Sequence, residues 1–137
     1  MIYLTRRERF SAAHRMYREE WSDEENYKVF GKCSNPNWHG HNYILFVTVK
    51  GRISPETGFV MNLTELKTII NEIVINKLDH KNINLEVDFM RGKVATTENL
   101  AIAIWNELKP HIRNRGSELH CVKITETENN YVEYYGE

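Results

Sequence analysis

The sequence predicts an α+β fold in which a four-stranded antiparallel sheet carries two helices on one face, in the element order ββααββ. Three observations lead to this prediction. The segment 39–51, HGHNYILFVTVKG, places apolar side chains on one parity from Tyr43 to Val49, which is typical of a half-buried strand. The segment 62–78, NLTELKTIINEIVINKL, repeats apolar residues at helical spacing. The segment 119–137 alternates as two strands around a Glu-Asn-Asn turn.

The N-terminal third predicts one further strand and a short helix. Residues 2–14, IYLTRRERFSAAH, carry β-favouring residues, with Phe10, Ala12 and His14 on one parity. The stretch SDEENYKVF begins with Ser22 before acidic residues, as an N-cap does, and predicts a short helix. The long polar segment around it is typical of a functional loop.

The second long helix is expected over 96–110, TTENLAIAIWNELKP. Thr96 or Thr97 and the early Glu98 fit a helix N-terminus, and Pro110 is expected to follow its end. Asn62 or Thr64 is the expected cap of the preceding helix. The residues between the two helices, DHKNINLEVDFMRGKVA, are expected to form a loop. Pairing of the two sheet edges with other copies would make the protein a homo-oligomer.

Length and composition indicate one soluble globular domain over residues 1–137. The chain is 41% hydrophobic and 27% charged, and its formal net charge is -1. This charge gives no electrostatic case for nucleic acid or an anionic membrane. No apolar run spans a bilayer and no signal peptide is expected. Two cysteines, Cys33 and Cys121, suit a reducing compartment, so a cytoplasmic location is expected.

Three histidines predict a metal site. His39 and His41 lie two residues apart at the start of a strand, so both imidazoles project from the same face. Gly40 between them adds no side chain. Such a pair can converge on one zinc ion at roughly 2.0–2.1 Å. His14 can supply a third ligand if the first two strands are neighbours, as consecutive strands often are. Three histidines with an open position describe a catalytic zinc, whereas an isolated H-x-H pair is also compatible with surface residues.

Cys33 lies in a polar loop directly after Lys32. A lysine neighbour and a nearby metal cation both favour a thiolate. Cys33 is therefore a candidate base or nucleophile, or else the fourth zinc ligand. Cys121 lies within a strand and is most simply a packing residue.

Asp79 and His80 follow the first long helix, in LDHKN. One interpretation is a helix C-terminus, where a charged histidine favours the dipole. The other makes His80 a proton-transfer group oriented by a carboxylate. Adjacent residues in an extended chain point to opposite sides, so Asp79 can orient His80 only where the backbone turns, or else through another subunit.

Glu126, in ITETENN, ends the third predicted strand. A lone glutamate is most often a solvated charge. Its alternative role is to accept two N–H donors from the edge of a guanidine-like ring, a geometry that carboxylates favour.

Together these residues resemble the 6-pyruvoyltetrahydropterin synthase family. The matching motifs follow the family's order over nearly the whole chain: FSAAHRM, SDEEN, GKCSNPNWHGHNY, TGFVMNLTELK, LDHKN, TTENLAIAIW and KITETENN. The resemblance implies the tunnelling fold, in which subunits join their sheets into a barrel. It also implies a homohexamer built as a dimer of trimers, with active sites between subunits.

The resemblance further implies a role for each candidate residue. His14, His39 and His41 match the zinc ligands. Cys33 matches the catalytic cysteine, and Asp79 with His80 completes the proton-transfer group. Glu126 matches the pterin anchor, assisted by the segment Thr96, Thr97 and Glu98. The implied enzyme is a carbon-oxygen lyase that converts 7,8-dihydroneopterin triphosphate to 6-pyruvoyltetrahydropterin with loss of triphosphate. Four basic residues are available for the triphosphate: Arg15, Arg18, Lys28 and Lys32.

Three other functions compete with this one. The sister enzyme 6-carboxytetrahydropterin synthase, of 7-deazaguanine and queuosine biosynthesis, uses the same substrate and also releases acetaldehyde. Its members usually have a shorter gap between the cysteine and His-Gly-His, whereas SNPNW separates Cys33 from His39 here. Trp38 stands where the family commonly has glycine. A non-catalytic metal or pterin-binding module, and an oligomeric structural protein with incidental histidines, are the remaining alternatives.

Overall fold

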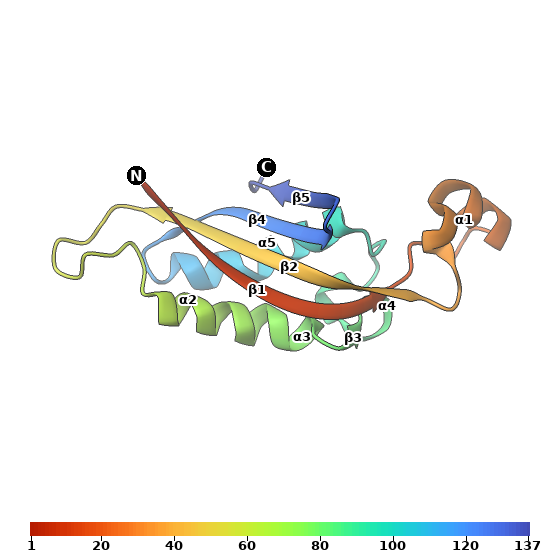
Figure 1. The fold of residues 1–137 in the computed structure, drawn as a ribbon, viewed down its shortest axis with the longest axis horizontal. Coiled ribbons are helices and arrows are strands. Elements are labelled where there is room, and N and C mark those ends of the chain that lie inside the picture. The colour runs from red at the N-terminus through yellow and green to blue at the C-terminus, as the bar shows by residue number, and fades with distance from the viewer.

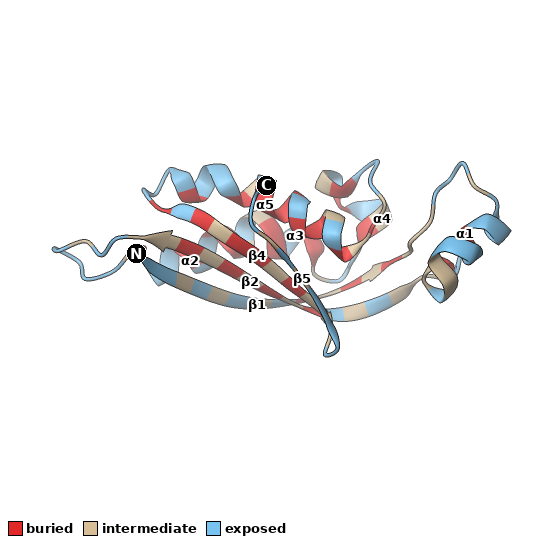
Figure 2. Ribbon diagram, turned by 90° about the horizontal axis from the view of Figure 1, so that it is seen from above, coloured by how far each residue is buried: buried red, intermediate tan, exposed pale blue.

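The computed structural model describes residues 1–137 and contains one five-stranded sheet in the order β3-β1-β2-β4-β5. The helices α2, α3 and α5 cover one face of this sheet and leave the other face open (Figures 1 and 2). The strands are β1 (Ile2–His14), β2 (His39–Gly51), β3 (Lys81–Asn82), β4 (Glu118–Thr127) and β5 (Asn130–Tyr134). The helices are α1 (Asp23–Phe30), α2 (Leu63–Ile70), α3 (Asn76–Leu78), α4 (Ile83–Glu86) and α5 (Thr97–Arg113). A π-helical segment, Asn71–Ile75, joins α2 to α3, and short 3-10 turns lie at Gly31–Ser34 and Asp88–Met90.

The α+β class is confirmed, but the prediction of a four-stranded, purely antiparallel sheet is wrong. The four predicted strands pair antiparallel in the order β1-β2-β4-β5. The fifth strand, β3, lies in the segment that was expected to be a loop, and it pairs parallel to β1 at Ala12 and Ala13. Two paired residues are too few to leave a period-2 pattern in the sequence, so this strand had no signal.

The helical segments begin as predicted, but α5 ends later. Asn62 caps α2, since its Oδ1 accepts a 2.8 Å hydrogen bond from the Thr64 amide. Thr96 caps α5 and accepts from the Asn99 amide at 3.2 Å. Pro110 lies inside α5 and does not follow its end. The missing N–H of a proline costs one helical bond. Burial of Ile112 beyond it keeps the last turn in place. None of the helices combines the length and the apolar character that crossing a bilayer requires.

The core lies between the sheet and the helices (Figure 2). Every second residue of β2 from Tyr43 to Val49 is at most 1% exposed, and the apolar stripes of α2 and α5 pack against this face. Burying one such aliphatic side chain contributes roughly 1.5–3 kcal/mol. The same parity carries His39, His41 and His14 toward the helix-covered face, and it thereby positions the candidate site at one end of the core.

Candidate metal centre and active site

The three predicted metal ligands converge. In the antiparallel pairing of β1 with β2, His14 lies directly opposite His39. His41 follows on the same face, two residues along β2. One ligand atom from each ring lies within 4.8 Å of the other two. His14 is 1% exposed, whereas His39 and His41 are partly exposed, so the cluster is buried on its β1 side and more open on its β2 side.

The histidines carry the features that a bound cation requires. The Nδ1 atom of His14 lies 2.7 Å from the carbonyl oxygen of Ala95 and donates to it, which leaves Nε2 as a lone pair. The Nε2 atoms of His14 and His39 are buried and have no hydrogen-bond partner. Burial is the largest effect that lowers the pKa of both imidazoles, and it favours the neutral form that ligates metals. Two neutral, buried and unpartnered nitrogens aimed at one space fit a divalent metal ion.

Glu126, near the end of β4, lies beside the histidine cluster. Its two carboxylate oxygens are each 4.0 Å from an imidazole Nε2, one of His14 and one of His41. Thr97 Oγ1 donates a 2.5 Å hydrogen bond to Glu126 Oε2. The carboxylate is therefore held in one orientation by the first turn of α5, while its other oxygen keeps its acceptor capacity.

The three predicted substrate-binding residues at the start of α5 have different contacts: Thr96, Thr97 and Glu98. Thr97 is buried and contacts Glu126, whereas Thr96 acts as the helix cap that sets the position of this turn. Glu98 is exposed, and its side chain makes no hydrogen bond or ion pair within the chain. The three residues are adjacent in sequence, but only Thr97 joins the cluster directly.

Cys33 belongs to the 3-10 turn Gly31–Ser34 and is partly exposed. Its thiol is not among the ligand atoms that converge with the three histidines. The amide of Met16 donates a 2.9 Å hydrogen bond to the Cys33 carbonyl, which ties this turn to the segment that follows β1. The alternative of a fourth metal ligand therefore has no support in this geometry.

Asp79 and His80 form a pair at the β1–β3 edge of the sheet. Asp79 Oδ2 lies 3.1 Å from His80 Nδ1, and His80 has a φ of 61°. This left-handed turn is the change of direction that lets neighbours in the sequence face each other. Ser11 holds both residues, because its amide donates to Asp79 Oδ1 at 2.9 Å and its carbonyl accepts from the His80 amide at 2.6 Å. The imidazole is 83% exposed, so the pair faces solvent in the single chain.

The predicted triphosphate cations fall into two classes. Arg15 Nε donates a 2.7 Å hydrogen bond to the carbonyl of Ser34, and Arg18 Nε donates to Glu20 Oε1 at 2.5 Å. Both arginines are therefore engaged within the chain. By contrast, neither Lys28 nor Lys32 makes an ion pair.

Tyr43, which carried no functional prediction, also belongs to this region. Tyr43 continues the parity of His39 and His41, and its ring centroid lies 5.5 Å from that of His41. Its hydroxyl is buried without a partner. Burial raises the pKa of Tyr43, and the charges of Glu126 and Cys33 add to this effect. The shared parity with the two histidines was the available signal.

Trp38 precedes the first β2 histidine and has a φ of 68°. Its indole packs edge-on against Tyr17, with ring centroids 6.4 Å apart. A left-handed backbone favours glycine, the residue that the family resemblance implies at this position. The bulky side chain is accommodated at the cost of a strained backbone.

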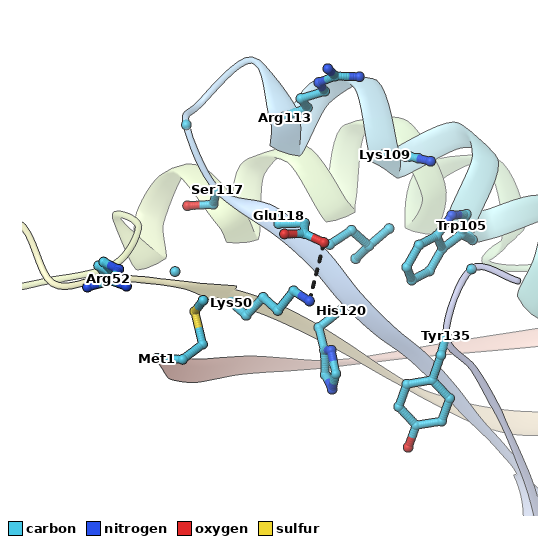
Figure 3. Close-up of a pocket in the computed structure, with 14 residues that line it drawn as sticks. Met1, Lys50, Arg52, Trp105, Lys109, Arg113, Ser117, Glu118, His120 and Tyr135 are labelled. Carbon is cyan, nitrogen blue, oxygen red and sulfur yellow. Dashed lines mark ion pairs between the residues drawn. The ribbon is translucent and has the colours of Figure 1, made fainter.

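A hollow of 720 Å³ lies at the opposite end of the sheet (Figure 3). Its basic side chains do not converge. Lys50 Nζ pairs with Glu118 Oε1 at 3.3 Å, and Arg113 extends from α5 away from this pair. The hollow shares no residue with the histidine cluster.

Comparison with known proteins agrees with the motifs. The model of the family "6-pyruvoyl tetrahydropterin synthase" matches residues 3–137. The chain belongs to this family. It is 52% identical to the 6-pyruvoyl tetrahydrobiopterin synthase of Dictyostelium discoideum over 99% of this chain and 97% of the relative. It is 50% identical to the Homo sapiens protein of the same name over 98% of this chain and 91% of the relative.

The fold of the family is also matched. A solved structure of 6-pyruvoyl tetrahydropterin synthase from Caenorhabditis elegans has a TM-score of 0.92 and 39% identity, and covers 99% of this chain and 96% of its own. A more distant relative, from Archaeoglobus fulgidus, bears the name putative 6-carboxy-5,6,7,8-tetrahydropterin synthase. It is 32% identical over 90% of this chain and 87% of the relative.

Proposed function

We propose that this protein is a zinc-dependent lyase that converts 7,8-dihydroneopterin triphosphate to 6-pyruvoyltetrahydropterin with elimination of triphosphate. The observation that carries the proposal is the cluster of three convergent histidines beside an oriented carboxylate. A three-histidine set leaves a fourth position open for catalysis. Membership of the pterin synthase family supplies the substrate class.

The metal would be zinc, held by His14, His39 and His41, because a set of three imidazole nitrogens suits this ion. Bound zinc supplies a Lewis acid for the hydroxyls of the substrate side chain. Glu126 accepts N–H groups from the edge of the pterin ring, and Thr97 keeps the carboxylate in the plane that this contact needs. Glu98 is assigned a contact with substrate from outside the cluster.

Cys33 acts as the base that removes a proton from a carbon of the substrate side chain, since its thiol stays off the metal ligands. The triphosphate then leaves with the electron pair of its carbon–oxygen bond. Asp79 holds the ring of His80 through Nδ1, so Nε2 of His80 is the atom that exchanges protons with the substrate. The reaction is an elimination with internal rearrangement and needs no external oxidant.

The proposal includes assembly into a barrel-forming homohexamer with active sites between subunits. The outer edge of β5 is unpaired, and β1 is paired by β3 only at Ala12 and Ala13. Both edges are therefore available for strand pairing with another copy. The exposure of the Asp79–His80 pair supports the same arrangement. In the assembly, a neighbouring subunit would place its own histidine site against this edge of the sheet and so give the exposed pair a substrate to act on. We further propose one domain over residues 1–137, a cytoplasmic location and no nucleic-acid or membrane partner.

The test is incubation of the zinc-loaded protein with 7,8-dihydroneopterin triphosphate and identification of the products by mass spectrometry. The expected products are 6-pyruvoyltetrahydropterin and triphosphate. A 6-carboxy product with acetaldehyde would assign the chain to the sister activity. Binding without release of triphosphate would leave only a binding module.

The variant Cys33→Ala separates the two roles of the cysteine. We expect it to lose turnover and to keep one zinc per chain, as measured by elemental analysis. Loss of zinc in this variant would make Cys33 a ligand and would contradict its role as the base. Cys121→Ala is the matched control, since Cys121 lies in β4 away from the cluster and should leave both readouts unchanged.

A further inference from the structure

Tyr43 carries the only buried side-chain oxygen in the protein without a hydrogen-bond partner. The residue is 1% exposed. A buried tyrosine hydroxyl usually finds a partner, because leaving it unpaired costs free energy without any return. The two other unpartnered buried atoms are imidazole nitrogens of the metal cluster, His14 Nε2 and His39 Nε2. All three orphans therefore belong to one region.

The ring of Tyr43 is held firmly in this region. Phe10, its cross-strand partner, stacks on it with a centroid separation of 4.8 Å and an interplanar angle of 9°. His14 and His41 meet it edge-on, with centroids 6.1 Å and 5.5 Å away. Phe10 fills the equivalent place on β1 without a hydroxyl, so packing alone does not require one.

The surrounding protein groups do not satisfy the hydroxyl. Thr97 already donates to Glu126, and the Tyr43 hydroxyl makes no hydrogen bond to that carboxylate. A neutral imidazole nitrogen that ligates a metal has no lone pair left to accept a hydrogen bond. The acceptor that suits this donor is therefore not a protein group.

We propose that Tyr43 is a positioning residue whose hydroxyl donates a hydrogen bond to an oxygen acceptor that enters the histidine site only together with the metal ion, a water molecule in the metal-loaded, substrate-free protein. The inference rests on the metal site of the proposed function and deepens it. Without an acceptor in the site the buried hydroxyl is unpaired, and it then lowers the stability of the metal-free protein. Removing it should therefore relieve the metal-free state and weaken the filled one.

The test compares the full-length protein with Tyr43→Phe. In excess chelator, the variant is expected to unfold at the same temperature as the parent or at a higher one. Zinc affinity, measured by competition with a chelating dye, is expected to fall about tenfold, the lower end for loss of an outer-sphere partner. The matched control is Tyr131→Phe, an exposed tyrosine of β5, which should change neither quantity.

A lower unfolding temperature of metal-free Tyr43→Phe would overturn the inference, because the hydroxyl would then have a partner inside the protein. Unchanged zinc affinity would overturn it as well. If the parent protein binds zinc and forms product while Tyr43→Phe binds zinc equally well, only this inference fails. If the parent protein binds no zinc, the proposed function and the inference fail together.

Discussion

Thr97 Oγ1 donates a 2.5 Å hydrogen bond to Glu126 Oε2 and so joins the first turn of α5 to β4. The two residues are 29 positions apart in the chain. Thr96 places this turn by capping the helix, and the buried side chain of Thr97 then has one acceptor within reach. The bond fixes the carboxylate beside His14 and His41, where a ring edge can meet it.

Thr97→Val removes this bond while it keeps the shape of the side chain. A hydrogen bond to a charged group contributes about 1.5–3 kcal/mol. We expect pterin affinity, measured by fluorescence titration, to fall at least about tenfold, with zinc content unchanged. Thr97→Ser is the control that keeps the hydroxyl and should bind nearly as the parent does. Equal affinity of the valine variant would show that Glu126 needs no orientation by Thr97.

The left-handed backbone at Trp38 predicts an unusual ranking of two small substitutions. Trp38→Ala and Trp38→Gly both lose the contact with Tyr17, but only alanine keeps a side chain at positive φ. A side chain at positive φ destabilises the folded alanine variant by about 1–2 kcal/mol. Glycine has the greater conformational entropy in the unfolded chain, which destabilises the glycine variant by about 0.4–1 kcal/mol. We expect Trp38→Gly to be the more stable by roughly 0.5–1 kcal/mol in urea unfolding. A more stable alanine variant would mean that the strain is absent.

Asp79 predicts a pH dependence of stability. The pKa of its carboxyl is lowered, mainly because the Ser11 amide donates to it, with the hydrogen bond to His80 as a further cause. A depressed folded-state pKa gives stability that is present above the unfolded value and lost as pH falls through the folded one. The stability difference between the parent and Asp79→Asn should therefore be constant near pH 6 and shrink below about pH 4.

Chemical unfolding of the parent and of Asp79→Asn from about pH 6 to about pH 3 measures this difference. Asp88→Asn is the control, since that carboxylate is 90% exposed and pairs only with Arg91 on the surface. Its difference from the parent should stay small across the range. A constant gap between the parent and Asp79→Asn would contradict the predicted linkage.

We expect Lys32 to contact the triphosphate. It is exposed, precedes Cys33 and makes no ion pair, whereas Arg15 is held by the Ser34 carbonyl. Lys32→Gln should weaken binding of inorganic triphosphate several-fold at low salt, with a smaller effect at high salt because exposed charges are screened. Isothermal titration measures this. Lys109→Gln, on α5 in the remote hollow, is the control, and an equal loss there would indicate non-specific attraction.

The sequence by itself determined most of the strands and helices and pointed to the candidate residues, whose chemical roles stay predictions. The β1 and β2 ranges, the cap at Asn62 and the parity of His39 and His41 all follow from local patterns, which period-2 and 3.6-residue spacing record directly. The order of motifs also identified the family. These features depend on residues close together in the chain, so a single sequence carries them.

Only the tertiary structure decided the relationships between distant segments. The pairing of His14 with His39, the contact of Thr97 with Glu126 and the parallel strand β3 join residues that no local pattern connects. The left-handed turns at Trp38 and His80 occur in residues that rarely adopt them. The unpartnered hydroxyl of Tyr43 is a property of its surroundings. Packing decides the strand register, the residues that adopt a left-handed backbone and the side chains that are buried, and each of these depends on the whole chain.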